Sequence, residues 1–198
     1  MQLGMIGRVT AGVALLALAS LLASCGGIPL RSLPRLMKLQ EQLLDANPAE
    51  FMLAIQADAR VTPPAGAMPT LQMAIKPAVE GAFEPVDKKL PMRFVVTSGN
   101  SLGLATPPPN RRWLIYSLPP ESQAELQQLQ ATFKRLQAQS GSNRGGSVRV
   151  GISQEGLAVR DPALANTKWE TWLQTTKRDG FFELWSGTIA DLLKAAKT

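Results

Sequence analysis

The sequence predicts a single α+β domain, in which a mostly antiparallel β-sheet or compact sandwich is flanked by helices. A length of 198 residues suits one ordinary domain. Hydrophobic residues make up 45% of the chain, which is enough to bury a core. Four stretches with a strand-like period of two come before the clearest helical stretch. Four consecutive strands do not fit the alternation of strands and helices in a parallel sheet, so an antiparallel arrangement is favoured.

Residues 1–24 have the pattern of a cleaved secretory signal peptide. Only Arg8 is charged, and the uncharged run 9–24 is too short for a membrane span, which needs about 20 apolar residues. The run ends in Leu22-Ala23-Ser24-Cys25, which resembles the lipobox of bacterial lipoproteins. The resemblance implies cleavage before Cys25 and attachment of lipid, with acyl chains such as palmitate, to that residue. An ordinary secretory signal followed by a chance cysteine is the alternative.

Lipidation of Cys25 implies a protein that is anchored to a membrane of the cell envelope, because two or three acyl chains make attachment effectively stable. Gly26 follows the cysteine, and by resemblance to enterobacterial lipoproteins this favours the periplasmic face of the outer membrane. The chain has a net charge of +6, of which Arg8 alone is lost with the signal. This excess suits anionic lipid or an acidic protein partner. No nucleic-acid motif is present, so no nucleic-acid partner is expected.

Residues 25–49 are expected to form the lipidated N-terminus and a basic amphipathic helix. Apolar residues recur at helical spacing between Leu30 and Ala46, and Pro48 ends the helix. Its basic residues group on another side and are candidate contacts for lipid or a partner: Arg31, Arg35 and Lys38. The helix lies either on the lipid headgroups beside the anchor or against one edge of the domain core.

The globular domain is expected over residues 50–198 and begins with strands at 51–61, 71–79, 92–96 and 113–118. The first strand alternates apolar and polar residues, so it is expected to be half buried. The turn at Pro63, Pro64 and Gly66 predicts that the second strand pairs with the first. Residues 81–89 are expected to be a polar connection.

Helices and short strands are expected in the second half of the domain. The clearest helix follows Pro120, with one apolar stripe made by Leu126, Leu129, Phe133 and Leu136. The remaining expected elements are a flexible linker at 139–147, a hairpin at 148–159, a helix at 166–176, a strand at 181–185 and a helix capped by Thr188 with Asp191.

Two residue counts restrict the chemistry. Histidine is absent and Cys25 is the only cysteine, which excludes Ser-His-Asp and Cys-His catalysis and His-ligated metal sites. The stretch Gly99–Gly103 matches the G-x-S-x-G pattern, but without a histidine base Ser101 cannot act as that nucleophile. Carboxylates such as Asp58 and Glu183 are the remaining route, although each is expected on the polar side of a strand. We therefore expect no enzyme, no metal and no cofactor.

Two further features are candidate contact sites. Residues 97–112 are expected to be an exposed loop with polyproline character. It ends in Arg111 and Arg112, which are either phosphate contacts or solvated cations. Aromatic residues concentrate near the C-terminus: Trp169, Trp172, Phe181, Phe182 and Trp185. They belong either to the core or to a binding face. Trp185 and Phe181 are expected to be partly exposed.

These features favour a lipid-anchored, non-catalytic accessory or docking protein of the cell envelope. The alternative is a carrier or sensor of lipid or lipopolysaccharide at the membrane. A carboxylate-based envelope hydrolase is the third reading.

Overall fold

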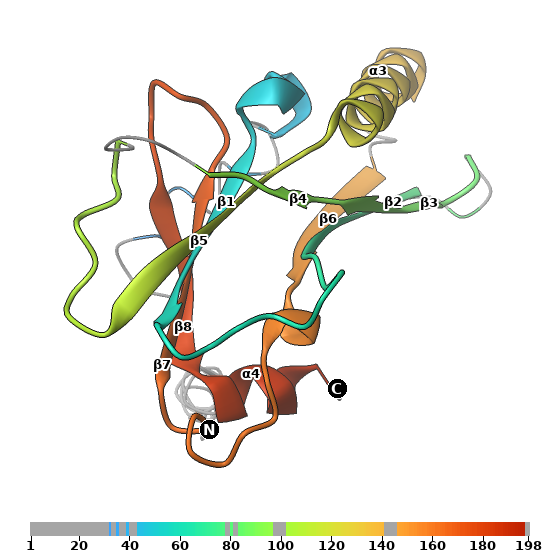
Figure 1. Ribbon diagram of the computed structural model, residues 1–198. Helices are drawn as coiled ribbons and strands as arrows, with labels where there is room; N and C mark the ends of the chain where they lie inside the picture. The colour runs from blue at the N-terminus through green and yellow to red at the C-terminus, as the bar shows by residue number, and fades with distance from the viewer. Residues whose placement is uncertain are drawn as a thin grey trace, which may run out of the picture.

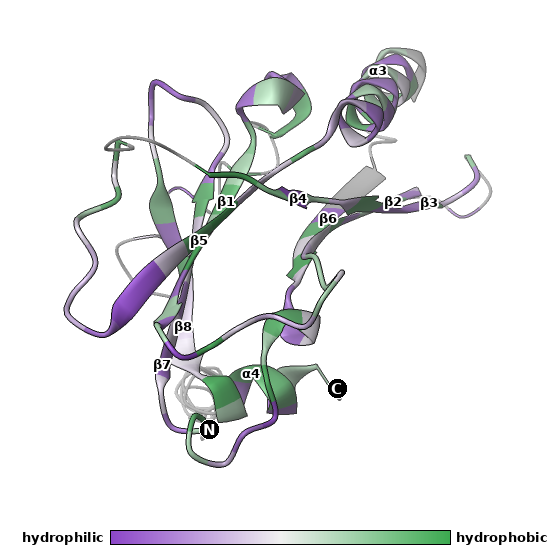
Figure 2. Ribbon diagram, viewed as in Figure 1, coloured by the Kyte–Doolittle hydropathy of each residue, from purple (hydrophilic) through white to green (hydrophobic). Residues whose placement is uncertain are grey.

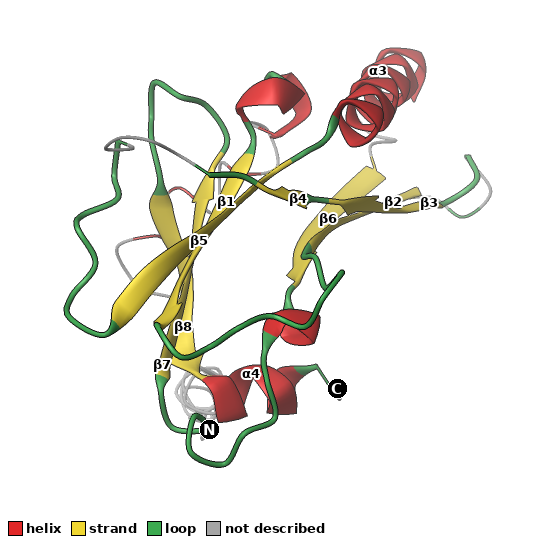
Figure 3. Cartoon of the chain, in the orientation of Figure 1, coloured by secondary structure: helices red, strands yellow, loops and turns green. Residues whose placement is uncertain are grey.

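The computed structural model describes residues 43–77, 83–96, 102–140 and 146–196, together with Ser32, Arg35, Leu39 and Glu80. These residues form one α+β domain of two antiparallel sheets with helices at their ends, so the predicted fold class is confirmed (Figure 1). Figure 3 shows helices α3 (Pro120–Ser140) and α4 (Ile189–Ala195) at opposite ends of the pair of sheets. Several residues singled out in the sequence lie outside the described part: Cys25, Arg31, Lys38 and Ser101.

The larger sheet has five strands in the order β4-β5-β1-β7-β8. Their bounds are Arg93–Phe94 for β4, Arg111–Ser117 for β5, Met52–Asp58 for β1, Lys168–Gln174 for β7 and Phe182–Thr188 for β8. The central strand β1 is buried on both faces, because Leu53 and Ile55 enter the core between the sheets while Ala54 lies in a second apolar cluster on the outer face. The expectation of a half-buried strand was therefore wrong.

The smaller sheet has three strands in the order β3-β2-β6, with β2 at Thr70–Pro77, β3 at Val86–Pro91 and β6 at Gly146–Ser153. Alternate residues of β2 point into the core and are fully buried: Leu71, Met73 and Ile75. The predicted pairing of the first two strands was wrong, because β1 and β2 belong to different sheets. The predicted polar connection was also wrong, since it contains most of β3. Its exposed charges suit an edge strand that must not pair with another chain.

The long helix α3 (Pro120–Ser140) confirms the helix predicted after Pro120. It buries Leu126, Leu129 and Phe133 in the main core. Its Gln130 donates hydrogen bonds from Nε2 to the carbonyl oxygens of Leu43 at 2.7 Å and Ala46 at 2.9 Å.

The described end of the N-terminal helix packs on the domain. Leu39 and Leu43 are buried in the main core, and the 3-10 turn η2 (Pro48–Glu50) follows and leads into β1. Of the two placements expected for this helix, the described residues favour the edge of the core. None of the helices in the described part of the chain is long and apolar enough to span a membrane.

Two predicted elements near the C-terminus take another form. The predicted hairpin is only the strand β6 and the 3-10 turn η3 (Glu155–Leu157). The predicted helix at 166–176 is the strand β7, which places Trp169 and Leu173 in the core. The final helix α4 (Ile189–Ala195) is confirmed, with the predicted capping box between Thr188 and Asp191.

Candidate functional site

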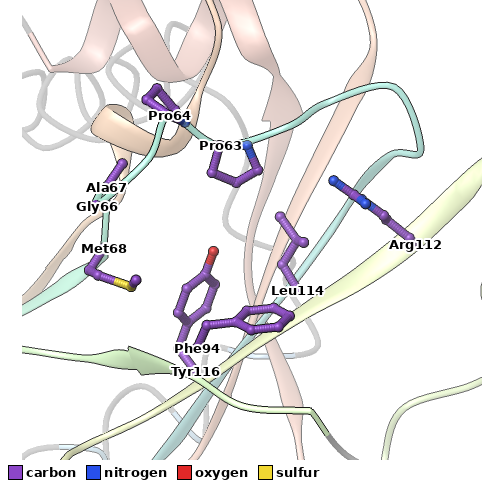
Figure 4. Close-up of a pocket in the computed structure, with 9 residues that line it drawn as sticks. All are labelled: Pro63, Pro64, Gly66, Ala67, Met68, Phe94, Arg112, Leu114 and Tyr116. Carbon is purple, nitrogen blue, oxygen red and sulfur yellow. The ribbon is translucent and has the colours of Figure 1, made fainter.

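A pocket of about 250 Å³ opens between the loop after β1 and the strands β4 and β5 (Figure 4). It lies on the side of β5 that faces the smaller sheet. Its lining is mostly apolar, with one cation and one phenol: Pro63, Pro64, Gly66, Ala67, Met68, Phe94, Arg112, Leu114 and Tyr116. We call it the Arg112 pocket.

Local sequence rules explain how the pocket forms. Alternate residues of β5 point to the same side, so Arg112, Leu114 and Tyr116 form one wall. Phe94 on β4 is opposite Tyr116 in the register, and the two rings meet edge to face with centroids 5.7 Å apart. The other wall is the turn predicted from its prolines, in which Gly66 has a positive φ of 77°.

The hydroxyl of Tyr116 points into the pocket (Figure 4). The residue is only 2% exposed, and burial raises the pKa of Tyr116 to about 12, although the positive charge of Arg112 acts in the opposite direction. Tyr116 therefore keeps its proton at neutral pH. It offers a hydrogen-bond donor to any group that enters the pocket.

Arg112 contributes a guanidinium group whose hydrogen bonds are incompletely used. Its Nη2 donates to the carbonyl oxygen of Val61, while its Nε is buried without an acceptor. No carboxylate among the described residues forms an ion pair with Arg112. The carboxylate at this end of β5, Glu170, pairs with Arg111 instead. Arg111 donates from Nη1 to Glu170 at 2.7 Å and from Nη2 to the carbonyl oxygen of Gln56 at 2.7 Å.

Large apolar side chains are exposed at the pocket and next to it in the chain. Met68 is 44% exposed and Phe94 is 47% exposed, and both line the pocket. Val96 is 90% exposed and follows Phe94 by two residues, which places it on the same side of the extended chain. We call these three residues the apolar rim.

The structure separates the predicted contact residues from one another. Arg111 and Arg112 lie in β5, not in a flanking loop as expected, and they face opposite sides of the sheet; Figure 2 shows the hydrophilic start of this strand. Arg35 packs its Cζ 5.5 Å from the ring centroid of Phe182. Trp185 is half-buried against the main core. Of the predicted contact residues that the structure describes, only Arg112 lines the pocket.

The described part of the predicted loop covers the outer face of the larger sheet. Trp113 donates from Nε1 to the carbonyl oxygen of Ala105 at 2.9 Å, and its ring meets Trp172 with centroids 5.9 Å apart. The backbone nitrogen of Phe181 donates to the carbonyl oxygen of Leu102 at 2.8 Å. Phe181, expected to be partly exposed, is 3% exposed because it lies under this loop.

Several acidic residues of the described part of the chain form ion pairs or cap a helix. Asp58 accepts hydrogen bonds from Arg60, which lower its pKa to about 2. Burial would raise the pKa of Glu170, but hydrogen bonds from Lys168 and Arg111 outweigh it and lower the pKa. Among the described residues, no group of three or more acidic, cysteine or histidine side chains is placed to hold a metal ion.

Sequence reasoning found Arg112 but missed the rest of the pocket. The sequence predicts strands for Phe94 and Tyr116 and a turn near Met68, but not their contact, because that contact depends on pairing between distant segments. The turn-forming prolines after β1, Pro63 and Pro64, were the one local signal. Comparison with protein-family models, with curated proteins and with solved structures gave no match for this chain.

Proposed function

We propose that the chain is a lipid-anchored docking protein of the bacterial cell envelope, without catalytic activity, on the periplasmic face of the outer membrane. The resemblance of Leu22-Ala23-Ser24-Cys25 to a lipobox supports the anchor. The apolar rim is the observation that carries the docking function, because large apolar side chains exposed together mark interaction surfaces. The partner is a protein of the same compartment.

The packing of the domain supports docking over the alternative of a lipid or lipopolysaccharide carrier. Phe51 and Trp169 are among the fully buried side chains that fill the space between the sheets. The Arg112 pocket, at about 250 Å³, is smaller than sites for drug-sized ligands, which measure about 300–1,000 Å³. Asp58, one carboxylate considered for the hydrolase reading, has a lowered pKa and stays ionised, so it is a poor general acid near neutral pH.

The anchor is tested by lipid labelling in a bacterial host. Cells that express the full chain or Cys25→Ser are fed a palmitate analogue that can be tagged, and their membranes are fractionated. We expect label and protein together in the outer-membrane fraction for the unchanged chain, and neither for Cys25→Ser. Equal labelling of both proteins would contradict lipidation at Cys25.

Docking is tested by site-specific photo-crosslinking in the same cells. A photoreactive amino acid replaces Val96 in the rim or, as a control, Gln128 on the exposed side of α3. We expect the rim position alone to give one defined adduct with an envelope protein, and Phe94→Ser to reduce it. An adduct of equal yield from both positions, or none from the rim, would count against docking through this surface.

A further inference from the structure

We propose that the Arg112 pocket binds the free C-terminal carboxylate of a partner protein whose last residue is apolar. This inference rests on the proposed docking function and names the chemistry of the partner. The charge, the lining, the size and the rim of the pocket support it.

The charge of the pocket calls for an anion. Arg112 is half-buried, lines the pocket and has no carboxylate partner in the described part of the chain. A half-buried cation without a counter-charge is costly, and an entering anion offsets that cost. A planar carboxylate matches the fork of a guanidinium group, which can donate two parallel hydrogen bonds to it.

The second donor and the apolar walls restrict the anion further. Tyr116 remains protonated at neutral pH, so its hydroxyl can donate to a carboxylate oxygen but repels no anion. Apart from these two residues the lining is made of aliphatic, aromatic, proline and glycine residues, such as Leu114 and Phe94. One cation in apolar surroundings favours a singly charged carboxylate with an apolar neighbour over a doubly charged phosphate.

The size of the pocket and the exposure of its rim point to the end of a polypeptide. About 250 Å³ holds a small group, such as a single side chain with its carboxylate. The apolar rim continues beyond the pocket, with Val96 at 90% exposed, so the occupant extends over the surface outside it. Capture of a terminal carboxylate with an adjacent side chain is an established mode of peptide recognition.

The test compares two acetylated tetrapeptides that end in leucine, one with a free C-terminus and one amidated, against the purified full chain in detergent. Binding is measured by calorimetry and by the NMR signal of the Arg112 Nε–H group. We expect the free acid to bind about 10-fold or more tightly than the amide and to shift the Arg112 signal, because hydrogen bonds to charged groups contribute strongly. This comparison uses the unchanged protein, so it does not depend on the folding of any variant.

Substitutions then assign the effect to the pocket. Arg112→Gln should abolish the preference for the free acid, and Tyr116→Phe should weaken binding by about 5-fold. Arg149→Gln removes the same charge from an exposed position on β6 and should leave binding unchanged. Loss of the preference in Arg149→Gln would show that it reflects net charge and would overturn the assignment to the pocket.

Further outcomes separate this inference from the proposed function. Equal binding of acid and amide would overturn the carboxylate site, while a rim adduct at Val96 in the crosslinking experiment would still support docking. Hexanoate that binds as tightly as the free-acid peptide would reassign the pocket to small free acids. Inorganic phosphate that competes with the peptide at equal concentration would overturn the preference for a carboxylate.

Discussion

Replacement of Gly103 by alanine tests how firmly the loop is held on the outer face of the larger sheet. Gly103 has a φ of 90°, and an added Cβ would lie 2.3 Å from the backbone oxygen and 2.8 Å from the backbone nitrogen of Phe181. Backbone atoms cannot rotate away, so the loop must move. Gly66 is a matched control, because its φ is 77° and an added Cβ would meet nothing within 4 Å.

The two substitutions differ in one cost. Both force alanine into the left-handed region, which destabilises the folded state by about 1–2 kcal/mol. Gly103→Ala also separates Leu102 from Phe181, and the hydrogen bond between them, 2.8 Å long, is lost. A buried donor left without a partner costs about 1–3 kcal/mol. We therefore expect Gly103→Ala to lose about 1–3 kcal/mol more than Gly66→Ala.

Urea unfolding followed by circular dichroism gives both free energies of unfolding. Tryptophan emission of the native state gives an independent signal, because Trp113 donates to Ala105 of this loop and packs on Trp172. We expect a red shift for Gly103→Ala and none for Gly66→Ala. Equal losses of stability, with unchanged emission in both variants, would refute the view that close contact with Phe181 holds the loop.

Three other predictions concern titration and capping. The lowered pKa of Glu170 means that its stabilisation is present above the ordinary value of 4.5 and is lost as the pH falls through the folded-state pKa, so Glu170→Gln should flatten the decline in unfolding free energy below pH 4.5. Tyr116, the only tyrosine, should titrate at about 12 in the native protein and near 10.0 in urea, measured by phenolate absorbance; an unshifted native value would contradict its burial. Its contribution to stability is intact below pH 10.0 and is lost as the pH rises toward 12. Thr188→Ala should cost about 1 kcal/mol of unfolding free energy, whereas Thr188→Ser should retain it; equal losses would exclude the cap as the cause.

Helices with one apolar side were predictable because their signal is local. The stripe of α3 repeats at helical spacing against polar neighbours, and the Thr188 box carries both partners within four residues. Each of these patterns depends on residues that are close in the chain. Neither needs knowledge of what lies opposite in the fold.

Strand β7 could not be distinguished from a helix in the same way. Trp169, Trp172 and Leu173 have helical spacing, but Trp169 and Leu173 face the core while Trp172 packs on the outer face. A bulge between Thr171 and Trp172 shifts the pairing with β8. A strand that is covered on both sides has no clear period of two, so local pattern gives the wrong answer.

The pocket was beyond the reach of sequence for a different reason. Phe94 meets Tyr116 through the pairing of β4 with β5, and the turn after β1 closes the other side. Arg112 is next to Arg111 in the sequence, yet of the two only Arg111 pairs with a described carboxylate, because the two side chains face opposite sides of the sheet. Which arginine forms the ion pair depends on the position of Glu170, and Glu170 lies on β7, a strand that the sequence did not predict.

The strand order of the larger sheet also has a consequence for the time course of folding. Strand β1 lies at the centre, yet its neighbours β5 and β7 come from residues 111–117 and 168–174. During synthesis β1 is made before both neighbours, so one of its edges stays unpaired until β5 is made and the other until β7 is made near the end of the chain. Such distant pairing slows folding, and an apolar strand with open edges is prone to join another chain in the meantime. The same arrangement that buries β1 on both faces therefore makes it the segment most in need of protection before folding is complete.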